Sequence, residues 1–514
     1  MAHQVGSSGI IAAPAGGAAR PRLPGMWAPF LLTIAAVGAL CAYALLLVAS
    51  SSRGAEMPVA APFAAGAFAF FQLIFPATRP RRDHVLSPLN WAVLAFFLQL
   101  VAMPLMISCV GMSRGTLPYL PSAPAVEKSL LLSILAFGAF SGGYAFLERG
   151  GRGAGARESA RLRLPRLLVA AYVVMGVAGI LLRFGSFGAM FATLGDPEKF
   201  WSGTPATETT LADAASTFLR PFLIGGIVMA WCAWIEQRGA RASRLARLLA
   251  SALAAAAMIL VGATYAFNRG SFVVPLVALA AAYSFHVRRL SMGALVSMAL
   301  LLLGLSAVFG QYRRGEATPA ELLEGGGQRE NVLPKDPLGE VQVYGSAPQF
   351  AGFLLEAGER GERRFSPRVL LGSLMYPVPV LGKPFREESG PVIFNRLIYR
   401  ESDIVDQIIP FQAEVWLSLG PVGLLAAFLL LGALLARLQR AFDAAQTTFD
   451  SYAIQFTAIW ATFLIQGSLA VVSQVFVYFA LPIYGYMLVR RWLRRWEPDE
   501  ESPTVGLASL PASR

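Results

Sequence analysis

The sequence has few charged residues for its length. Lysine, arginine, aspartate and glutamate together make up 14% of the 514 residues, whereas hydrophobic residues make up 55%. Soluble globular chains carry about 25% charged residues. A deficit of this size, together with a mean hydropathy of +0.55, excludes an ordinary soluble protein and indicates an all-α polytopic membrane protein.

Cysteine is also scarce. The three cysteines, Cys41, Cys109 and Cys232, all lie inside apolar runs. This excludes a disulfide framework, and no zinc-ligand spacing is present. The net charge of +12 does not point to nucleic acid, because the basic residues occur as short clusters between apolar runs, which is the pattern of membrane topology.

Apolar runs long enough to cross a bilayer recur along the chain. About 20 apolar residues cross about 30 Å of hydrocarbon, and we predict about twelve spans. They are 27–49, 58–77, 87–110, 128–147, 165–183, 214–235, 247–267, 271–287, 291–310, 413–435, 452–471 and 474–489. Residues 1–25 are rich in alanine, glycine and proline, which predicts a disordered cytoplasmic N-terminus. Spans 1–9 thus fall within 26–310, with the first retained as an uncleaved anchor, and spans 10–12 fall within 413–489.

Every second connection between these runs is basic. The clusters are "TRPRRDH" (78–84), "ERGGRGAGARESARLRLPR" (148–166), "EQRGARASRLAR" (236–247), "HVRRL" (286–290), "ARLQR" (436–440) and "RRWLRRW" (490–496). Because arginine and lysine concentrate in cytoplasmic connections, we expect these clusters, both termini and the tail at 490–514 in the cytoplasm. The remaining connections are then external.

One external connection is far longer than the others. It covers 311–412, and connections of this size usually have a function. Residues 341–364 are expected to be helical. Residues 367–385 are apolar but contain three prolines, which favours an interfacial or re-entrant segment over a thirteenth span. We expect this external loop to form a cap over an outer cavity.

Several arginines lie at the external ends of the spans, against the usual distribution. The first is Arg269, in the tight turn of "ATYAFNRGSFVVPL". Its companions are Arg183, Arg220, Arg313 and Arg314. An arginine near hydrocarbon costs about 2.5–3.5 kcal/mol on insertion scales, and guanidinium groups bind phosphate oxygens through paired hydrogen bonds. A pyrophosphate at headgroup depth explains the group; a solvated or snorkelling Arg269 is the alternative.

The layout also carries a family resemblance. Many spans, a large late external loop and then "PFQAEVWLSLGPVGLLAAFLLLGALL" (410–435) resemble the O-antigen polymerase and ligase superfamily, specifically the Wzy-type repeat-unit polymerases. In that group the loop runs into a helix that opens with an acidic residue followed by Gly-x-x-Gly, here Glu414, Gly420 and Gly423. The "NRGS" turn (268–271) is similar to a turn between two spans in that family.

The resemblance implies a location and a reaction. Such enzymes act at the outer face of the bacterial inner membrane, and their fold is similar to all-helical membrane glycosyltransferases. They transfer a growing glycan from one undecaprenyl-pyrophosphate carrier to the sugar of another, for O-antigen, capsule or exopolysaccharide. No metal or cofactor is implied, because arginines can stabilise the leaving pyrophosphate. The implied partners are the lipid-linked oligosaccharide, the bilayer and a chain-length regulator protein.

The related ligases carry a histidine, their proposed general base, before Gly-x-x-Gly, and this chain has no histidine there. The three histidines of this chain, His3, His84 and His286, all fall on or near the cytoplasmic side of the predicted topology. A base must therefore be a carboxylate within hydrogen-bond reach of the acceptor hydroxyl. The candidates are Asp403, Asp406 and Glu414; as alternatives, these acids are solvated or pair with Arg396 or Arg400.

Aromatic side chains supply candidates for stacking on sugars. They are Trp201, Tyr312, Tyr344 and Trp416; a place in the interfacial aromatic belt is the alternative for each. The predicted substrate-binding set consists of Arg183, Arg220, Tyr312, Tyr344 and Arg396. Two other functions remain open. One is a ligase-like glycan transferase. The other is a twelve-span transporter or flippase, although the second half of the chain does not repeat the first.

Overall fold

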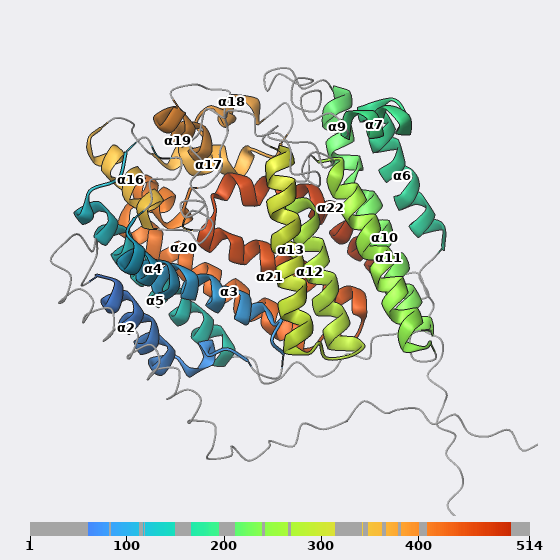
Figure 1. The fold of residues 1–514 in the computed structure, drawn as a ribbon, viewed down its shortest axis with the longest axis horizontal. Helices are drawn as coiled ribbons and strands as arrows, with labels where there is room; N and C mark the ends of the chain where they lie inside the picture. The colour runs from blue at the N-terminus through green and yellow to red at the C-terminus, as the bar shows by residue number, and fades with distance from the viewer. Residues whose placement is uncertain are drawn as a thin grey trace, which may run out of the picture.

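The computed structural model describes residues 60–81, 84–112, 117, 119–149, 166–194, 211–238, 242–265, 269–313, 342, 348–361, 366–378, 382–399 and 409–494. Within these residues the chain is all-helical and contains no β-strand, and the helices pack side by side (Figure 1). The predicted α-helical class is confirmed for this part. The predicted first span at 27–49 lies outside the described residues.

Helices of the first three fifths of the chain overlap the predicted spans 2–9, except Phe187–Leu194, which falls in the connection predicted between the fifth and sixth spans. They are α2 (Ala60–Ile74), α3 (Pro88–Phe97), the π-helix η3 (Leu98–Ala102), α4 (Met103–Val110), α5 (Ala123–Arg149), α6 (Arg166–Phe184), α7 (Phe187–Leu194), α9 (Leu211–Leu219), α10 (Pro221–Arg238), α11 (Arg244–Ala263), α12 (Arg269–His286) and α13 (Met292–Arg313), with the short 3-10 turn η2 (Pro76–Thr78) after α2. The sixth predicted span is divided at Arg220 into α9 and α10.

The remaining helices belong to the predicted external loop and to spans 10–12. The first group consists of four helices of 4 to 12 residues, α16 (Pro348–Glu359), α17 (Pro367–Met375), α18 (Lys383–Arg386) and α19 (Gly390–Tyr399). The second consists of α20 (Phe411–Asp443), α21 (Thr448–Gln466) and α22 (Leu469–Arg494). Each helix of the first group is shorter than the roughly 20 residues that cross a bilayer. We call this first group the cap helices.

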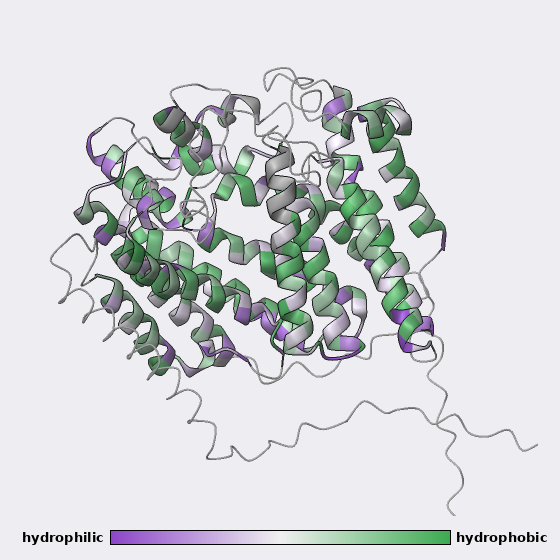
Figure 2. Ribbon diagram, in the orientation of Figure 1, coloured by the Kyte–Doolittle hydropathy of each residue, from purple (hydrophilic) through white to green (hydrophobic). Residues whose placement is uncertain are grey.

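Seven helical segments of the described part are long and apolar enough to cross a membrane. They are Pro88–Val110, Ala123–Glu148, Arg166–Phe184, Ala212–Arg238, Arg244–Ala263, Phe411–Asp443 and Leu469–Trp492. Three shorter apolar helices accompany them, Ala60–Ile74, Gly270–His286 and Met292–Leu302. Figure 2 shows apolar residues along the lengths of the helices and hydrophilic residues gathered near their ends. The chain is therefore built as an α-helical membrane protein.

Local sequence explains where several helices start and bend. The Ser243 hydroxyl accepts the Ala246 N–H at 3.2 Å at the start of α11, and Thr447 does the same for Asp450 at 3.1 Å in α21. The π-helix η3 ends at Ala102, two residues before Pro104, which has no N–H to donate within the helix. Gly420 has a φ of 69° inside α20, a conformation that favours glycine.

The basic connections meet at one end of the bundle, which we call the basic end. Arg81 lies between Asp443 and Glu148, at 2.6 and 3.5 Å, and so joins the end of α20 to the end of α5. At the same end, Arg490 Nη1 lies 2.9 Å from Asp450 Oδ1. Burial lowers the pKa of the Arg81 guanidinium, but Asp443 and its other neighbours outweigh this and raise the pKa.

The cap helices lie at the other end, the cap end, together with α7, α9 and the last turn of α13 (Figure 1). The cap is tied to the bundle through α5, because Glu356 Oε2 accepts the Ser122 N–H at 2.8 Å and Glu359 pairs with Lys128. The connections predicted to share one side of the membrane therefore do lie together. Which end faces the cytoplasm rests on the arginine distribution and stays a prediction.

Two apolar clusters form the interior of the bundle and meet at α21. The first joins α2, α3, α5 and α20, and Ala458, Ala461 and Ile465 of α21 belong to it. The second joins α6, α10, α11, α12 and α22, with Tyr452 and Phe456 of α21. Because α21 contributes residues to both clusters, it is the central helix that holds the two halves together.

Candidate functional site

Arg183 ends α6 at the cap end and pairs with Asp213 in the first turn of α9. Its Nη1 lies 2.7 Å from the Asp213 Oδ1, and the two side chains are only 22% and 24% exposed. An ion pair of this kind joins α6 to α9 across the connection between them. The guanidinium predicted to bind substrate therefore already has a carboxylate partner.

Arg220 lies at the junction of α9 and α10 and is 6% exposed. Its Nε donates to the Ser216 carbonyl oxygen at 3.4 Å, and its Nη1 donates to the carbonyl oxygen of Thr264. The guanidinium carbon lies 4.0 Å from the centre of the Tyr265 ring, at a cation–π distance. Arg220 thus connects the α9–α10 junction to the residues that lead into the "NRGS" turn.

Arg269 is the first residue of α12, and Tyr312 and Arg313 are the last two residues of α13. A side chain at Gly270 would place its Cβ 2.7 Å from Trp460 Cη2, so the start of α12 packs directly against α21. The side chains of Arg269, Tyr312 and Arg313 lie outside the described part. Other predicted site residues lie wholly outside it: Trp201, Arg314, Tyr344, Arg400, Asp403 and Asp406.

Glu414 is fully buried in the first turn of α20 and joins three segments. Its Oε1 accepts the hydroxyl of Ser373 in α17 at 2.6 Å, and its Oε2 accepts the Leu469 N–H at the start of α22 at 3.2 Å. A buried carboxylate needs such partners because its desolvation is costly. In this structure Glu414 faces protein donors on both oxygens, and a catalytic role for it stays a prediction.

Further contacts extend this buried node. The Ser373 Oγ accepts the Gly390 N–H at 3.3 Å, and Ser473 of α22 donates to the Ser373 carbonyl oxygen at 2.8 Å. Gly390 approaches so closely that a Cβ there would lie 2.5 Å from the Glu414 Oε1. We call Ser373, Gly390, Glu414, Leu469 and Ser473 the Glu414 node. It fixes α17 and the first residue of α19 to the starts of α20 and α22.

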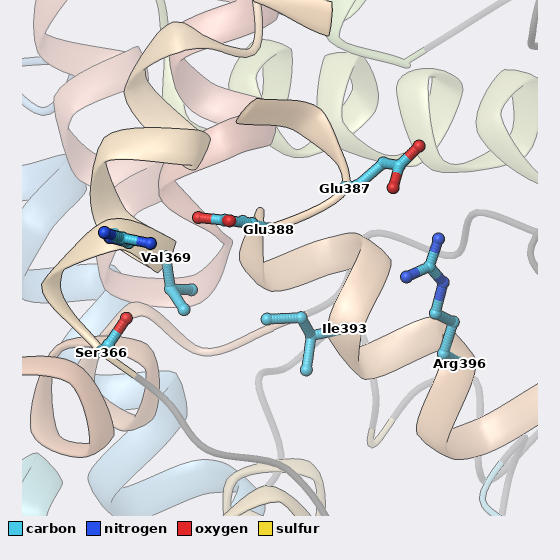
Figure 3. A pocket seen from close by; sticks show the side chains of 7 residues that line it. Ser366, Val369, Glu387, Glu388, Ile393 and Arg396 are labelled. Carbon is cyan, nitrogen blue, oxygen red and sulfur yellow. The ribbon is translucent and has the colours of Figure 1, made fainter. Parts of the chain in front are cut away.

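A cavity of about 420 Å³ opens between α17 and α19 beside this node. Its lining residues are Ser366, Arg368, Val369, Glu387, Glu388, Ile393 and Arg396. Figure 3 shows Glu388 and Ile393 extending toward Ser366 and Val369, with Glu387 and Arg396 at the other end of the cavity. Of the predicted substrate-binding residues, Arg396 therefore lines a cavity.

The predicted site residues fall into separate groups in the structure. Arg183 and Arg220 lie around α9, whereas Arg396 and Glu414 belong to the cap and its attachment to α20. Among the described residues, no hydrogen bond or ion pair joins one predicted site residue to another. Trp416, a predicted stacking residue, packs half-buried against the first apolar cluster.

Residues that the sequence did not identify complete the cap. Ser373 and Arg368 lie in the segment 367–385, predicted only as interfacial or re-entrant, and Glu388 lies in the rest of the long external loop. The sequence gives only a general signal: an acid buried at the start of an apolar helix requires a donor, which a hydroxyl group can supply. Nothing in the sequence identifies which hydroxyl it is. The two charged residues have no periodic or motif signal.

Comparisons with other proteins add no assignment. No family model, curated protein or solved structure matches the chain. In the residues that the structure describes, no three of the histidine, cysteine, aspartate and glutamate side chains lie close enough together to hold a metal ion.

Proposed function

We propose that the protein is a membrane glycosyltransferase that polymerises oligosaccharide repeat units linked to undecaprenyl pyrophosphate. The observation that carries the proposal is the cap: four short helices from the late loop lie at one end of a membrane bundle, and two of them, α17 and α19, are attached through Glu414, the acidic residue of the family-like segment. The resemblance in span layout and in the residues 410–435 supports the same function.

The reaction is a glycosyl transfer between two lipid-linked substrates. A hydroxyl oxygen of the acceptor sugar attacks the anomeric carbon of the donor glycan and forms the new C–O bond. The bond from that carbon to the pyrophosphate oxygen breaks, and undecaprenyl pyrophosphate leaves with the electron pair. The acceptor proton passes to a carboxylate, for which Asp403, Asp406 and Glu414 are the candidates.

Arginines divide between two roles in this proposal. Arg183 and Arg220 have protein partners and hold α9 in place. We therefore assign the pyrophosphate contacts to Arg269, the first residue of α12, to Arg313, the last residue of α13, and to Arg314, which follows Arg313 in the sequence. Preorganised cations at the leaving group stabilise charge that develops in the transition state.

The test is a reconstituted transfer assay. Purified protein in liposomes receives lipid-linked repeat units isolated from cells that express this chain, and the products are separated by length. The proposal predicts a ladder of lengthened glycans still attached to the lipid carrier. Transfer of glycan to lipid A without lengthening would instead identify a ligase. Movement of unaltered substrate across the bilayer, without any transfer, would identify a transporter.

A further inference from the structure

The cavity between α17 and α19 has an unusual polar lining. Four of its seven lining residues are charged, two arginines and two glutamates, namely Arg368, Arg396, Glu387 and Glu388. None of these four side chains forms an ion pair or hydrogen bond with another residue that the structure describes. Charged side chains that converge on a cavity without pairing are available to a ligand.

The balance of charge indicates the kind of ligand. Two guanidinium groups offer only donors and two carboxylates offer only acceptors, so the lining complements groups that both donate and accept. Hydroxyl groups do both. Glu387 and Glu388 would repel a pyrophosphate, which needs a surplus of cations. Val369 and Ile393 add a small apolar surface, suited to the C–H face of a sugar ring.

The walls of the cavity are held in place by the Glu414 node. Arg368 and Val369 lie in α17 five and four residues before Ser373, and Glu388 lies two residues before Gly390. Ser373 and Gly390 are hydrogen-bonded to each other, and Ser373 to Glu414. The two walls are therefore fixed before a ligand arrives, which lowers the entropic cost of binding.

From these observations we infer that this cavity binds the sugar residues of an uncharged, hydroxyl-rich segment of the glycan, apart from the arginines assigned to the carrier pyrophosphate. This inference rests on the proposed function for the identity of the glycan. The cavity thus gives Arg368 and Glu388, which no motif marked, a role in substrate binding.

The test measures binding separately from transfer. The probe is a set of oligosaccharides of one to four repeat units, released from the surface polysaccharide of cells that express this chain and freed of lipid and phosphate. Binding to purified protein in nanodiscs is compared for the wild type, Arg368→Gln and Glu388→Gln. The matched control is Glu127→Gln, an exposed glutamate of α5 at the same end of the bundle.

We expect each cavity variant to bind the oligosaccharide at least about tenfold more weakly, the effect of losing one charge-assisted contact, and the control to bind like the wild type. All four proteins should bind sugar-free undecaprenyl pyrophosphate equally. Unchanged oligosaccharide binding in both cavity variants would overturn the inference, and so would weaker binding of the sugar-free carrier.

If the wild type lengthens glycans but binds no free oligosaccharide, the cavity inference fails and the proposed function stands. If the cavity binds oligosaccharide but no lengthening occurs, the proposed function fails and the binding site stands.

Discussion

Arg269 stands directly before the closest contact at the start of α12. Because Gly270 meets the Trp460 ring, a larger residue at 270 would push α12 away from α21. The close contact holds the first turn of α12 against α21, and a residue on a rigid element is better positioned for a ligand than one on a loose loop. A change at Arg269 therefore tests the pyrophosphate assignment.

We expect Arg269→Ala to lower the transfer rate by roughly 30- to 1000-fold, since a lost charge-assisted phosphate contact is worth about 2–4 kcal/mol. Arg269→Lys keeps the charge but loses the paired donors, so it should retain part of the rate. The readouts are the rate in liposomes and the length distribution of the surface glycan. The control is Arg289→Ala, an exposed arginine beyond the other end of α12. A wild-type ladder from Arg269→Ala would show that Arg269 is only a snorkelling residue.

For Glu414 we predict an effect on thermal stability, because its carboxylate accepts hydrogen bonds that hold the cap helices to the bundle. Glu414→Ala leaves the Ser373 hydroxyl and the Leu469 N–H without their acceptor, at a cost of about 1–3 kcal/mol per unpaired group. We expect a lower midpoint of thermal unfolding in detergent and an intermediate value for Glu414→Gln, whose amide still offers one oxygen. Glu127→Ala, at an exposed position, should leave the midpoint unchanged. Equal midpoints for Glu414→Ala and the wild type would mean that the node does not stabilise the cap.

At the scale of elements, the pairing of α5 with α20 depends on close backbone contact. A Cβ at Gly143 would lie 2.1 Å from the Leu429 carbonyl oxygen, and one at Gly432 would lie 2.0 Å from the Phe140 carbonyl oxygen. Neither partner is a flexible side chain that can move aside. Small residues at helix crossings in membranes allow such approach, so these two glycines set the distance between the helices.

Neighbouring glycines of α5 provide a matched test of this contact. We expect Gly143→Ala to destabilise the protein by at least about 1–3 kcal/mol, the usual cost of overpacking. Gly142→Ala meets nothing within 4 Å and should be neutral or slightly stabilising, because alanine favours helix by about 1 kcal/mol over glycine. Thermal unfolding in detergent compares the two. If both variants unfold at the same temperature, the two helices are able to separate without cost.

At the scale of the whole molecule, the connections sort into two ends, and the arginine distribution predicts which end is inside. Reporter fusions at position 327 and at the C-terminus test this orientation. The first should give an external signal and the second a cytoplasmic one, because basic clusters alternate along the chain. A cytoplasmic signal at position 327 would contradict the orientation for every span after it.

Whether the proposed transfer requires a metal is also a question about the whole molecule. If arginines stabilise the leaving pyrophosphate, the transfer should proceed in the presence of EDTA at a rate close to that without it. The assay is the reconstituted ladder with and without the chelator. Complete loss of products in EDTA, with recovery on adding magnesium or manganese, would show that a divalent metal supplies the charge instead.

The sequence alone determined the helices and their grouping. Apolar runs of about 20 residues can satisfy their backbone groups in lipid only as helices, so each predicted span in the described part overlaps helix. The predicted eleventh span, 452–471, nevertheless crosses the break at Gly467 and Ser468 between α21 and α22. The alternation of basic clusters likewise predicted which connections share an end, and Arg81 with Glu148 and Asp443 shows one such meeting. Both properties follow from local composition, which is readable residue by residue.

Only the tertiary structure decided what the buried and charged groups of the cap do. Glu414 meets Ser373 and Leu469, 41 and 55 residues away, and the cavity collects Arg368, Glu388 and Arg396 from two helices and the connection between them. Pairings of this kind depend on how helices pack, and packing is specified by shape at close contacts such as Gly390 against Glu414. The periodicity and spacing of residues in a single sequence do not predict this shape complementarity between helices.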